Sequence, residues 1–192
     1  MERRKIRAFV KFLNAIEILG VCFIILVALY FQFILGEIPC PLCLLQRLGL
    51  LGIAFGFLLN IRYHVQPSHY SLSLLSAILT AFVSLRQIAL HITSTGGYGS
   101  AVLGYHMYTW VFILCCVAII YIAIVMSFPR QYELKTDRQE ISEAKSKKVR
   151  AFTHIAFIIL LIVVAINLIS TFAECGWQQC PDNPVGYQLF HK

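Results

Sequence analysis

Five long apolar runs restrict the fold of this sequence more than any other feature. They cover about residues 12–35, 42–61, 70–92, 109–128 and 152–172. An α-helix needs about 20 predominantly apolar residues to cross the hydrocarbon core of a bilayer. Hydrophobic residues make up 59% of the 192-residue chain, and the mean hydropathy of +0.76 is far above that of a soluble domain. The sequence therefore predicts an all-α integral membrane protein, with five transmembrane helices in a single membrane domain over residues 1–192.

The positive charges predict how these helices are oriented. The formal net charge is +7, but the lysines and arginines cluster beside the apolar runs, as orientation signals do, so we expect no nucleic-acid partner. They concentrate in residues 1–11 and 129–150, whereas the segments expected on the other side contain only Lys192. We therefore expect a cytoplasmic N-terminus and an outer C-terminal tail over residues 173–192. The first run is too long for a signal peptide and lacks a small-residue cleavage site, so we expect it to be retained.

The seven cysteines fall into two groups. Three lie inside apolar runs, where a free cysteine packs as a small hydrophobic side chain: Cys22, Cys115 and Cys116. Four lie outside the runs or at the very start of one, in polar stretches that contain Pro or Gly: Cys40, Cys43, Cys175 and Cys180. We expect any thiol chemistry of this protein to belong to the second group.

Cys40 and Cys43 form a C-x-x-C motif at the start of the second apolar run. A thiolate at a helix N-terminus is favoured by the free backbone N–H groups and by the helix dipole, which makes it a nucleophile. Arg47 follows Cys43 by four residues, so it lies on the same helix face, about 6 Å further along the axis. A zinc site is the alternative interpretation of the motif, but it requires a second close pair or histidine ligands.

Two further side chains near the outer end of the third run, Arg86 and His91, are candidates for the same site. Arg86 and Arg47 share roughly the same depth near the outer leaflet, and the sequence offers neither of them an acidic residue at that level. A permanent cation stabilises both a thiolate and the negative charge that develops on a quinone oxygen. The alternative is that an arginine near a helix end extends to the lipid headgroups. His91 either donates a proton or hydrogen-bonds a backbone group.

The predicted orientation brings both cysteine pairs to one face of the membrane, which is oxidising if it is the periplasmic face. Two dithiols on one face suggest thiol–disulfide exchange, which passes electrons between pairs but cannot dispose of them. The sequence contains no haem-attachment, dinucleotide or flavin motif, so a lipid-soluble quinone, ubiquinone or menaquinone, is the expected acceptor.

Three segments resemble the disulfide bond formation protein B (DsbB) family. They are Cys40-Pro-Leu-Cys-Leu-Leu-Gln-Arg47, Arg86-Gln-Ile-Ala-Leu-His91 and Tyr108-Thr-Trp110. The resemblance covers roughly residues 10–128. It implies a four-helix transmembrane bundle of DsbB type, here with an additional fifth helix, in the bacterial inner membrane with the active site facing the periplasm. It also implies a periplasmic DsbA-like thiol oxidoreductase as the partner.

The resemblance further implies roles for individual residues. Cys43 would be the thiolate that faces the quinone, Arg47 would support quinone and thiolate, and His91 would lie near the quinone headgroup. Proteins like DsbB usually carry their second cysteine pair between the third and fourth spans, but residues 93–108 contain no cysteine.

The second pair therefore lies in the tail, as Cys175 and Cys180. The favoured hypothesis is a relay, in which this pair takes electrons from the partner and is reoxidised by Cys40 and Cys43. The tail can extend at most about 25 Å from the membrane boundary, which suffices if the fifth helix packs near the first two. The alternative is a static disulfide, which for so short a loop contributes about 2 kcal/mol to stability.

Two other functions remain open from the sequence. A vitamin K epoxide reductase-like protein also combines quinone chemistry with a C-x-x-C motif, although there the active motif lies on a late helix. A non-enzymatic membrane protein could use the outer disulfides only to hold its loops.

Overall fold

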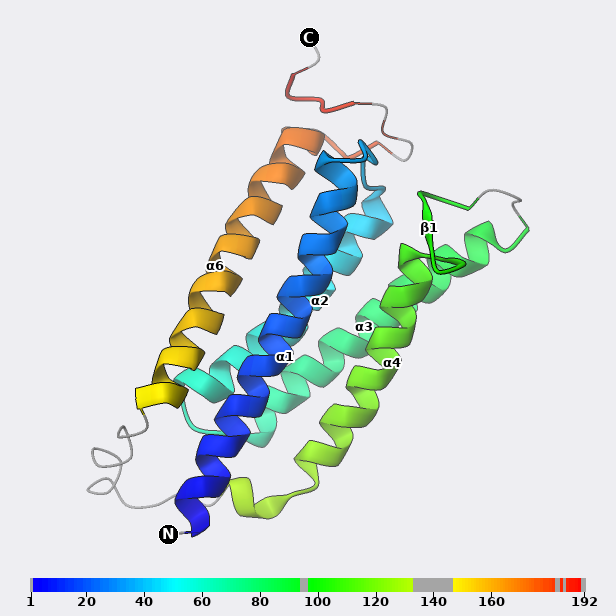
Figure 1. Ribbon diagram of the computed structural model, residues 1–192. Coiled ribbons are helices and arrows are strands. Elements are labelled where there is room, and N and C mark those ends of the chain that lie inside the picture. Colours follow the sequence, from blue (N-terminus) through cyan, green and yellow to red (C-terminus); the bar gives the residue numbers. More distant parts are fainter. Residues whose placement is uncertain (1, 94–96, 133–146, 182–183, 185, 191–192) are drawn as a thin grey trace.

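The computed structural model describes residues 2–93, 97–132, 147–181, 184 and 186–190. Figure 1 shows the helices α1 (Glu2–Phe33), α2 (Pro41–Arg62), α3 (Pro67–His91), α4 (Met107–Met126) and α6 (Lys147–Cys175), the strands β1 (Ala101–Val102) and β2 (Tyr105–His106), and the short helix η1 (Pro129–Gln131). Five of these helices are long and apolar enough to cross a membrane. The expected fold class, an all-α membrane protein, is confirmed, and the chain is a multi-pass membrane protein.

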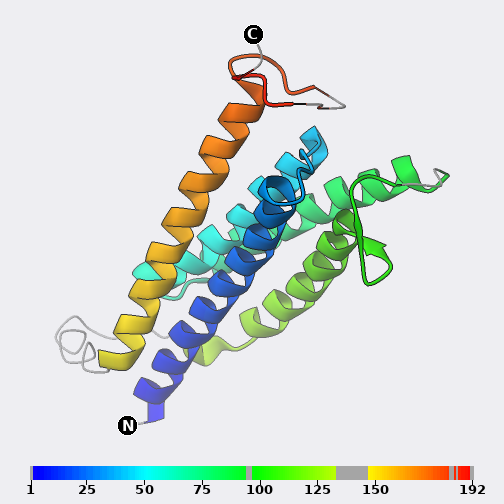
Figure 2. The same cartoon turned by 45° about the horizontal axis from the view of Figure 1, so that its top comes forward.

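The helices pack in an order that leaves α6 on the outside. α2 packs on α1 and α3, α3 packs on α4, and α6 packs mainly on α1, with a smaller contact to α2 (Figure 2). The N-terminus lies at one end of the bundle, and the start of α2 and the end of α6 lie together at the other end (Figure 1). Both cysteine pairs therefore lie at the same end of the molecule.

Small residues bring α2 and α3 into close contact. Gly49 faces Thr80, and Gly56 faces Ser73 and the backbone carbonyl of His69, at positions where an added Cβ atom would collide. Proline at the first position of each helix fixes where α2 and α3 begin, because its missing N–H is not needed there. This close packing holds the start of α2, with its two cysteines, against the last turns of α3.

The segments outside the helices are more structured than the sequence suggests. Residues 101–106 form an antiparallel hairpin in which Ala101 pairs with His106. The tail folds back on α6, because the backbone N–H groups of Gln188 and Leu189 donate to the carbonyls of Glu174 and Ala173. Cys175, which we expected in the tail, is the last residue of α6. Most of the expected cytoplasmic loop over residues 129–150 lies outside the described residues.

Candidate active site

Cys40 and Cys43 lie together at the N-terminus of α2. Cys40 caps the helix, and its Sγ accepts a hydrogen bond from the backbone N–H of Cys43 at 3.2 Å. Both are free thiols, with Cys40 buried and Cys43 half-buried. The pKa of Cys40 is raised well above its usual range, because its thiol is hydrogen-bonded to Cys43 and because it is buried. Cys40 is therefore the member of the pair that keeps its proton to higher pH.

Gln87 of α3 connects both sulfur atoms. Its side-chain Nε2 lies 3.3 Å from Sγ of Cys40 and 3.4 Å from Sγ of Cys43, and it donates to both. Its Oε1 accepts a hydrogen bond from Nε2 of Gln46 at 2.7 Å, which fixes the orientation of the amide. Gln87 is fully buried. This amide stabilises negative charge on either sulfur.

Arg47 is buried one turn below Cys43. Its Nη1 donates to Oε1 of Gln32 at 2.7 Å and its Nη2 donates to the carbonyl of Ala28 at 3.1 Å. The carboxylate that interacts electrostatically with it is Glu174 of α6. The expectation that no acidic residue lies at the level of Arg47 is therefore wrong, because α6 packs against α1 and α2 and delivers this carboxylate from outside the four-helix bundle.

Gln32 links this arginine to α6 and to the tail. Its Nε2 donates to Oγ of Ser170 at 2.7 Å and to the hydroxyl of Tyr187 at 3.3 Å. The cluster of Gln32, Arg47, Ser170, Glu174 and Tyr187 thus combines residues of α1, α2, α6 and the tail. It ties the fifth helix to the centre that contains Cys43.

Cys43 and Arg47 also line a pocket between α1, α2 and α4. Most of its wall is apolar and comes from the facing helices and the segment before α2: Ile24, Ala28, Phe31, Ile38, Leu50 and Val111. Tyr98 and Tyr108 form part of the same wall. An apolar pocket with a few convergent polar groups is the usual form of a small-molecule site.

His91 lies behind this pocket. Its ring stacks on Tyr108, with centroids 5.7 Å apart, and its Nδ1 lies 2.9 Å from the carbonyl oxygen of Gln87. It does not belong to the pocket wall, so Tyr108 stands between it and the pocket. Arg86 is exposed and is not part of the wall either. Arg47 and Arg86 share a depth in the bundle, but they point to different surroundings.

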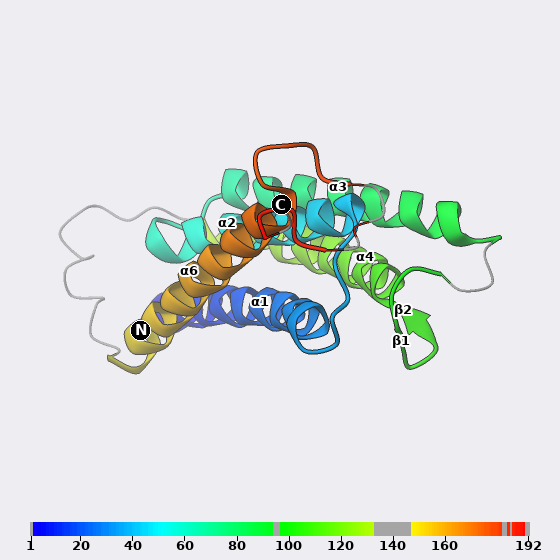
Figure 3. The ribbon, with the colours of Figure 1, turned by 90° about the horizontal axis from the view of Figure 1, so that it is seen from above.

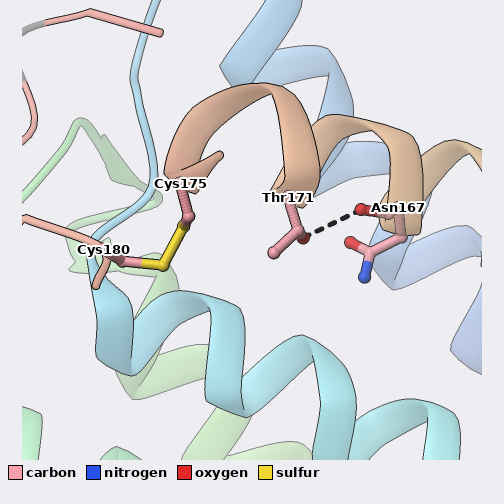
Figure 4. Close-up of a disulfide and its surroundings, with 4 residues drawn as sticks. All are labelled: Asn167, Thr171, Cys175 and Cys180. Atoms are coloured by element: carbon pink, nitrogen blue, oxygen red, sulfur yellow. Dashed lines mark hydrogen bonds between the residues drawn. A yellow bond between two sulfur atoms is a disulfide. The ribbon is translucent and has the colours of Figure 1, made fainter. Parts of the chain in front are cut away.

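Cys175 and Cys180 are joined by a disulfide at the end of α6. Cys175 is buried and Cys180 is half-buried. Figure 4 shows Cys180 beside the chain that leads into α2, and Figure 3 shows the tail lying over the start of α2. Among the residues searched, which are those that the structure describes, no three His, Cys, Asp or Glu side chains come together to hold a metal ion.

The comparison with known proteins agrees with the motif at the start of α2. The family model "Disulfide bond formation protein DsbB" matches residues 10–98. Over these residues the chain is similar to the DsbB family. The match includes Cys40, Cys43, Arg47, Arg86 and His91 and ends before α4, so α6 and the second cysteine pair lie outside it.

Curated relatives support the DsbB family over short segments. The disulfide bond formation protein B of Pasteurella multocida is 36% identical over 67 residues, which are 35% of this chain and 36% of that protein. Disulfide bond formation protein B 1 of Pseudomonas fluorescens Pf0-1 is 37% identical over 82 residues, 43% of this chain and 39% of the relative. The chain thus spans less than half of each of these relatives. No solved structure matches it.

Sequence reasoning did not assign Gln32, Gln87, Glu174 or Tyr108 to the site. A signal was available for the two glutamines, because a polar side chain inside an apolar run is costly and commonly functional. Tyr108 lies in one of the three segments that resemble the DsbB family, but the sequence alone gives it no role.

Proposed function

We propose that this protein is a membrane thiol:quinone oxidoreductase that reoxidises a periplasmic DsbA-like disulfide donor. One observation carries the proposal: Cys43 and the guanidinium of Arg47 line the same apolar pocket. A nucleophilic sulfur and a buried cation are thereby presented to a lipid-soluble molecule. The match of residues 10–98 to the DsbB family model supports disulfide bond formation as the context of this chemistry.

The pocket residues fit a quinone. The apolar wall suits the ring and the start of an isoprenoid tail, and Arg47, Gln46 and Tyr108 supply polar groups for the ring oxygens. A bound quinone supplies the site with an acceptor for two electrons and two protons. Arg47 would stabilise negative charge at an oxygen atom of the quinone ring. His91 stacks on Tyr108 and would hold the tyrosine ring in place at the pocket wall. Whether ubiquinone or menaquinone is used is a question for the assay.

The two cysteine pairs would act in sequence. A thiolate of the reduced partner attacks the Cys175–Cys180 disulfide, and the mixed disulfide resolves to leave the tail pair reduced and the partner oxidised. A tail thiolate then attacks the Cys40–Cys43 disulfide, which becomes a dithiol as the tail disulfide re-forms. The position of Cys180 beside the start of α2 supports this transfer (Figure 4). The burial of Cys175 favours the alternative, a static disulfide that holds the tail.

We infer that both pairs face the periplasm of a bacterial inner membrane. The support is that the lysine- and arginine-rich N-terminal segment lies at the opposite end of the bundle from both pairs (Figure 1). Cysteines introduced singly at the exposed positions Leu35 and Phe190, near the first and the second pair, and labelled with a membrane-impermeant thiol reagent in intact cells test this orientation. Labelling of the two from opposite sides of the membrane would end the proposal.

The activity test uses the purified full-length chain in lipid nanodiscs with a reduced thioredoxin-fold partner and either quinone. We expect one quinone reduced for each dithiol oxidised, and electron flow in the reverse direction would favour a vitamin K epoxide reductase-like enzyme. Cys43→Ser should abolish quinone reduction. Cys116→Ser, a half-buried free cysteine of α4, is the matched control and should not change it.

The relay is tested separately from quinone reduction. Cys175→Ser and Cys180→Ser should each abolish oxidation of the partner and leave quinone binding intact, because the pocket residues are unchanged. Full activity in both variants would show that the tail disulfide is static. Absence of quinone reduction by the unaltered protein would instead favour a structural role for the outer disulfides.

A further inference from the structure

Glu174 is a buried carboxylate beside the proposed reaction centre, on the helix that lies outside the family match. It is the penultimate residue of α6, directly before Cys175, and only 1% of it is exposed. Within the part of the chain that the structure describes, its Oε2 has no hydrogen-bond partner. An ionised carboxylate is costly to bury unless an opposite charge compensates it. The role of Glu174 must therefore follow from the charges around it.

Two ionisable groups of α2 interact with Glu174. Arg47 attracts its carboxylate, and Cys43 repels it when the sulfur is a thiolate. Arg47 interacts with both groups in turn. One buried cation therefore interacts with two acidic groups.

The backbone and the hydrogen bonds hold Glu174 in this position. Ser170, one turn earlier on α6, accepts a hydrogen bond from Gln32, which also accepts one from Arg47. The carbonyl of Glu174 accepts the backbone N–H of Gln188 at 3.2 Å. These contacts hold the end of α6, and with it the backbone of Glu174, against the centre.

One cation compensates one anion in a buried site. If Cys43 were a thiolate and Glu174 a carboxylate at the same time, the centre would carry a net negative charge in a largely buried site, where water screens it only weakly. If one of the two is neutral, Arg47 leaves the centre with no net charge. The electrostatic free energy is therefore lowest when only one of the two groups, Cys43 or Glu174, is ionised at a time.

We propose that Glu174 stores a proton for the Cys40–Cys43 pair, so that it is protonated when Cys43 is a thiolate and ionised when Cys43 and Cys40 form a disulfide. This inference rests on the proposed function, because it assumes that the pair cycles between these two states. Glu174 does not touch the reacting sulfur atoms. It acts through Arg47, by changing how much of that positive charge is left to stabilise the Cys43 thiolate.

The protons and electrons balance in each half of the cycle. The reduced tail pair gives two electrons to the Cys40–Cys43 disulfide and releases two protons as its own disulfide forms. Cys40 takes one proton and becomes a thiol, Glu174 takes the other, and Cys43 remains a thiolate. On reoxidation, Cys40 and Glu174 release these two protons to the quinone together with the electron pair. With Arg47, the centre carries no net charge in either state.

Other titratable groups near Glu174 do not disturb this balance. Tyr98 lies in the segment after α3, and burial raises its pKa, so it stays neutral. Tyr187 of the tail accepts a hydrogen bond from Gln32, and Gln32 on α1 carries no charge. Within the described residues, Arg47 and Cys43 are the groups whose charge Glu174 must match.

The test is the pH dependence of the midpoint potential of the Cys40–Cys43 pair in the full-length chain. The protein is equilibrated in thiol–disulfide buffers near neutral pH, the free thiols are trapped, and mass spectrometry reads each pair separately. In a two-electron couple, each proton bound on reduction changes the equilibrium constant tenfold per pH unit, about 30 mV. We expect a hundredfold change per pH unit, about 59 mV, in the unaltered protein and a tenfold change in Glu174→Gln.

Two further variants separate this effect from a change in structure. Glu174→Asp keeps an acid and should retain the two-proton slope. Glu17→Gln makes the same chemical change at a half-buried carboxylate of α1 in the opposite half of the bundle, and should also retain it. A two-proton slope in Glu174→Gln, or a one-proton slope in the unaltered protein, would overturn the inference. Because neither quinone nor partner takes part, failure here is distinct from failure of the proposed function.

Discussion

Gln87 offers the sharpest test of how the fold tunes the first cysteine pair. Its Nε2 donates to Sγ of both Cys40 and Cys43, and Gln87→Leu removes both hydrogen bonds at nearly the same volume. A hydrogen bond to a charged group contributes about 1.5–3 kcal/mol, and 1.4 kcal/mol corresponds to about 30 mV in a two-electron couple. The hydrogen bonds stabilise the reduced pair most, because its sulfur carries the charge. We therefore expect the midpoint potential to fall by about 30–65 mV.

The same substitution also leaves Nε2 of Gln46 buried without its acceptor, which should cost about 1–3 kcal/mol of stability. The double variant Gln46→Leu/Gln87→Leu removes both partners, so it should recover stability while keeping the lowered potential. Thiol-buffer titration measures the potential, and thermal unfolding in detergent measures the stability.

The control for Gln87 is Ser84→Ala, one turn earlier on the same helix. Ser84 is fully buried, and its Oγ has no hydrogen-bond partner among the described residues. Its removal should leave the potential unchanged. An unchanged or raised potential in Gln87→Leu, with the reduced pair intact, would refute the argument that this amide stabilises the thiolate.

Three further predictions concern neighbouring features. Arg47→Met should lower kcat/KM for the quinone by tenfold or more, because a hydrogen bond to a charged group contributes about 1.5–3 kcal/mol of free energy. Arg86 is exposed, so Arg86→Gln should change kcat/KM less than about twofold in the same steady-state assay. Gly49→Ala should lower the unfolding temperature because its Cβ collides with Thr80, and Thr80→Ala should restore most of the loss in a double-mutant cycle. Because the pKa of Cys40 is raised, its alkylation in the reduced protein should be slow at neutral pH, and its rate should still increase above pH 9. Mass spectrometry measures these alkylation rates, and a rate that levels off below about pH 8 would contradict the prediction.

The five helices and the first cysteine pair could be predicted because their signals are local. Bilayer crossing depends on the length and polarity of one run, and the cap of α2 depends on Cys40, Pro41 and Cys43 alone. The place of Arg47 one turn below Cys43 follows from helical geometry. The depth of Arg86 could be predicted in the same way by counting residues along the third helix.

The direction in which Arg86 points could not be predicted. Counting gives depth, but the face that α3 turns toward the pocket depends on how it packs against α2. That packing buries Gln87 and leaves the adjacent Arg86 exposed. The place of His91 behind Tyr108 has the same origin, because the hairpin before α4 brings that tyrosine under the imidazole ring.

The sequence by itself determined the membrane class, the five helices and the cysteine–arginine motif, since each depends on residues close together in the chain. Only the tertiary structure decided which helices meet. Gln32 and Ser170 are 138 residues apart, and their contact brings Glu174 to Arg47. Apolar helices in a bilayer present similar surfaces to many neighbours, so the choice of partner depends on a few buried polar contacts and small residues that no single run reveals.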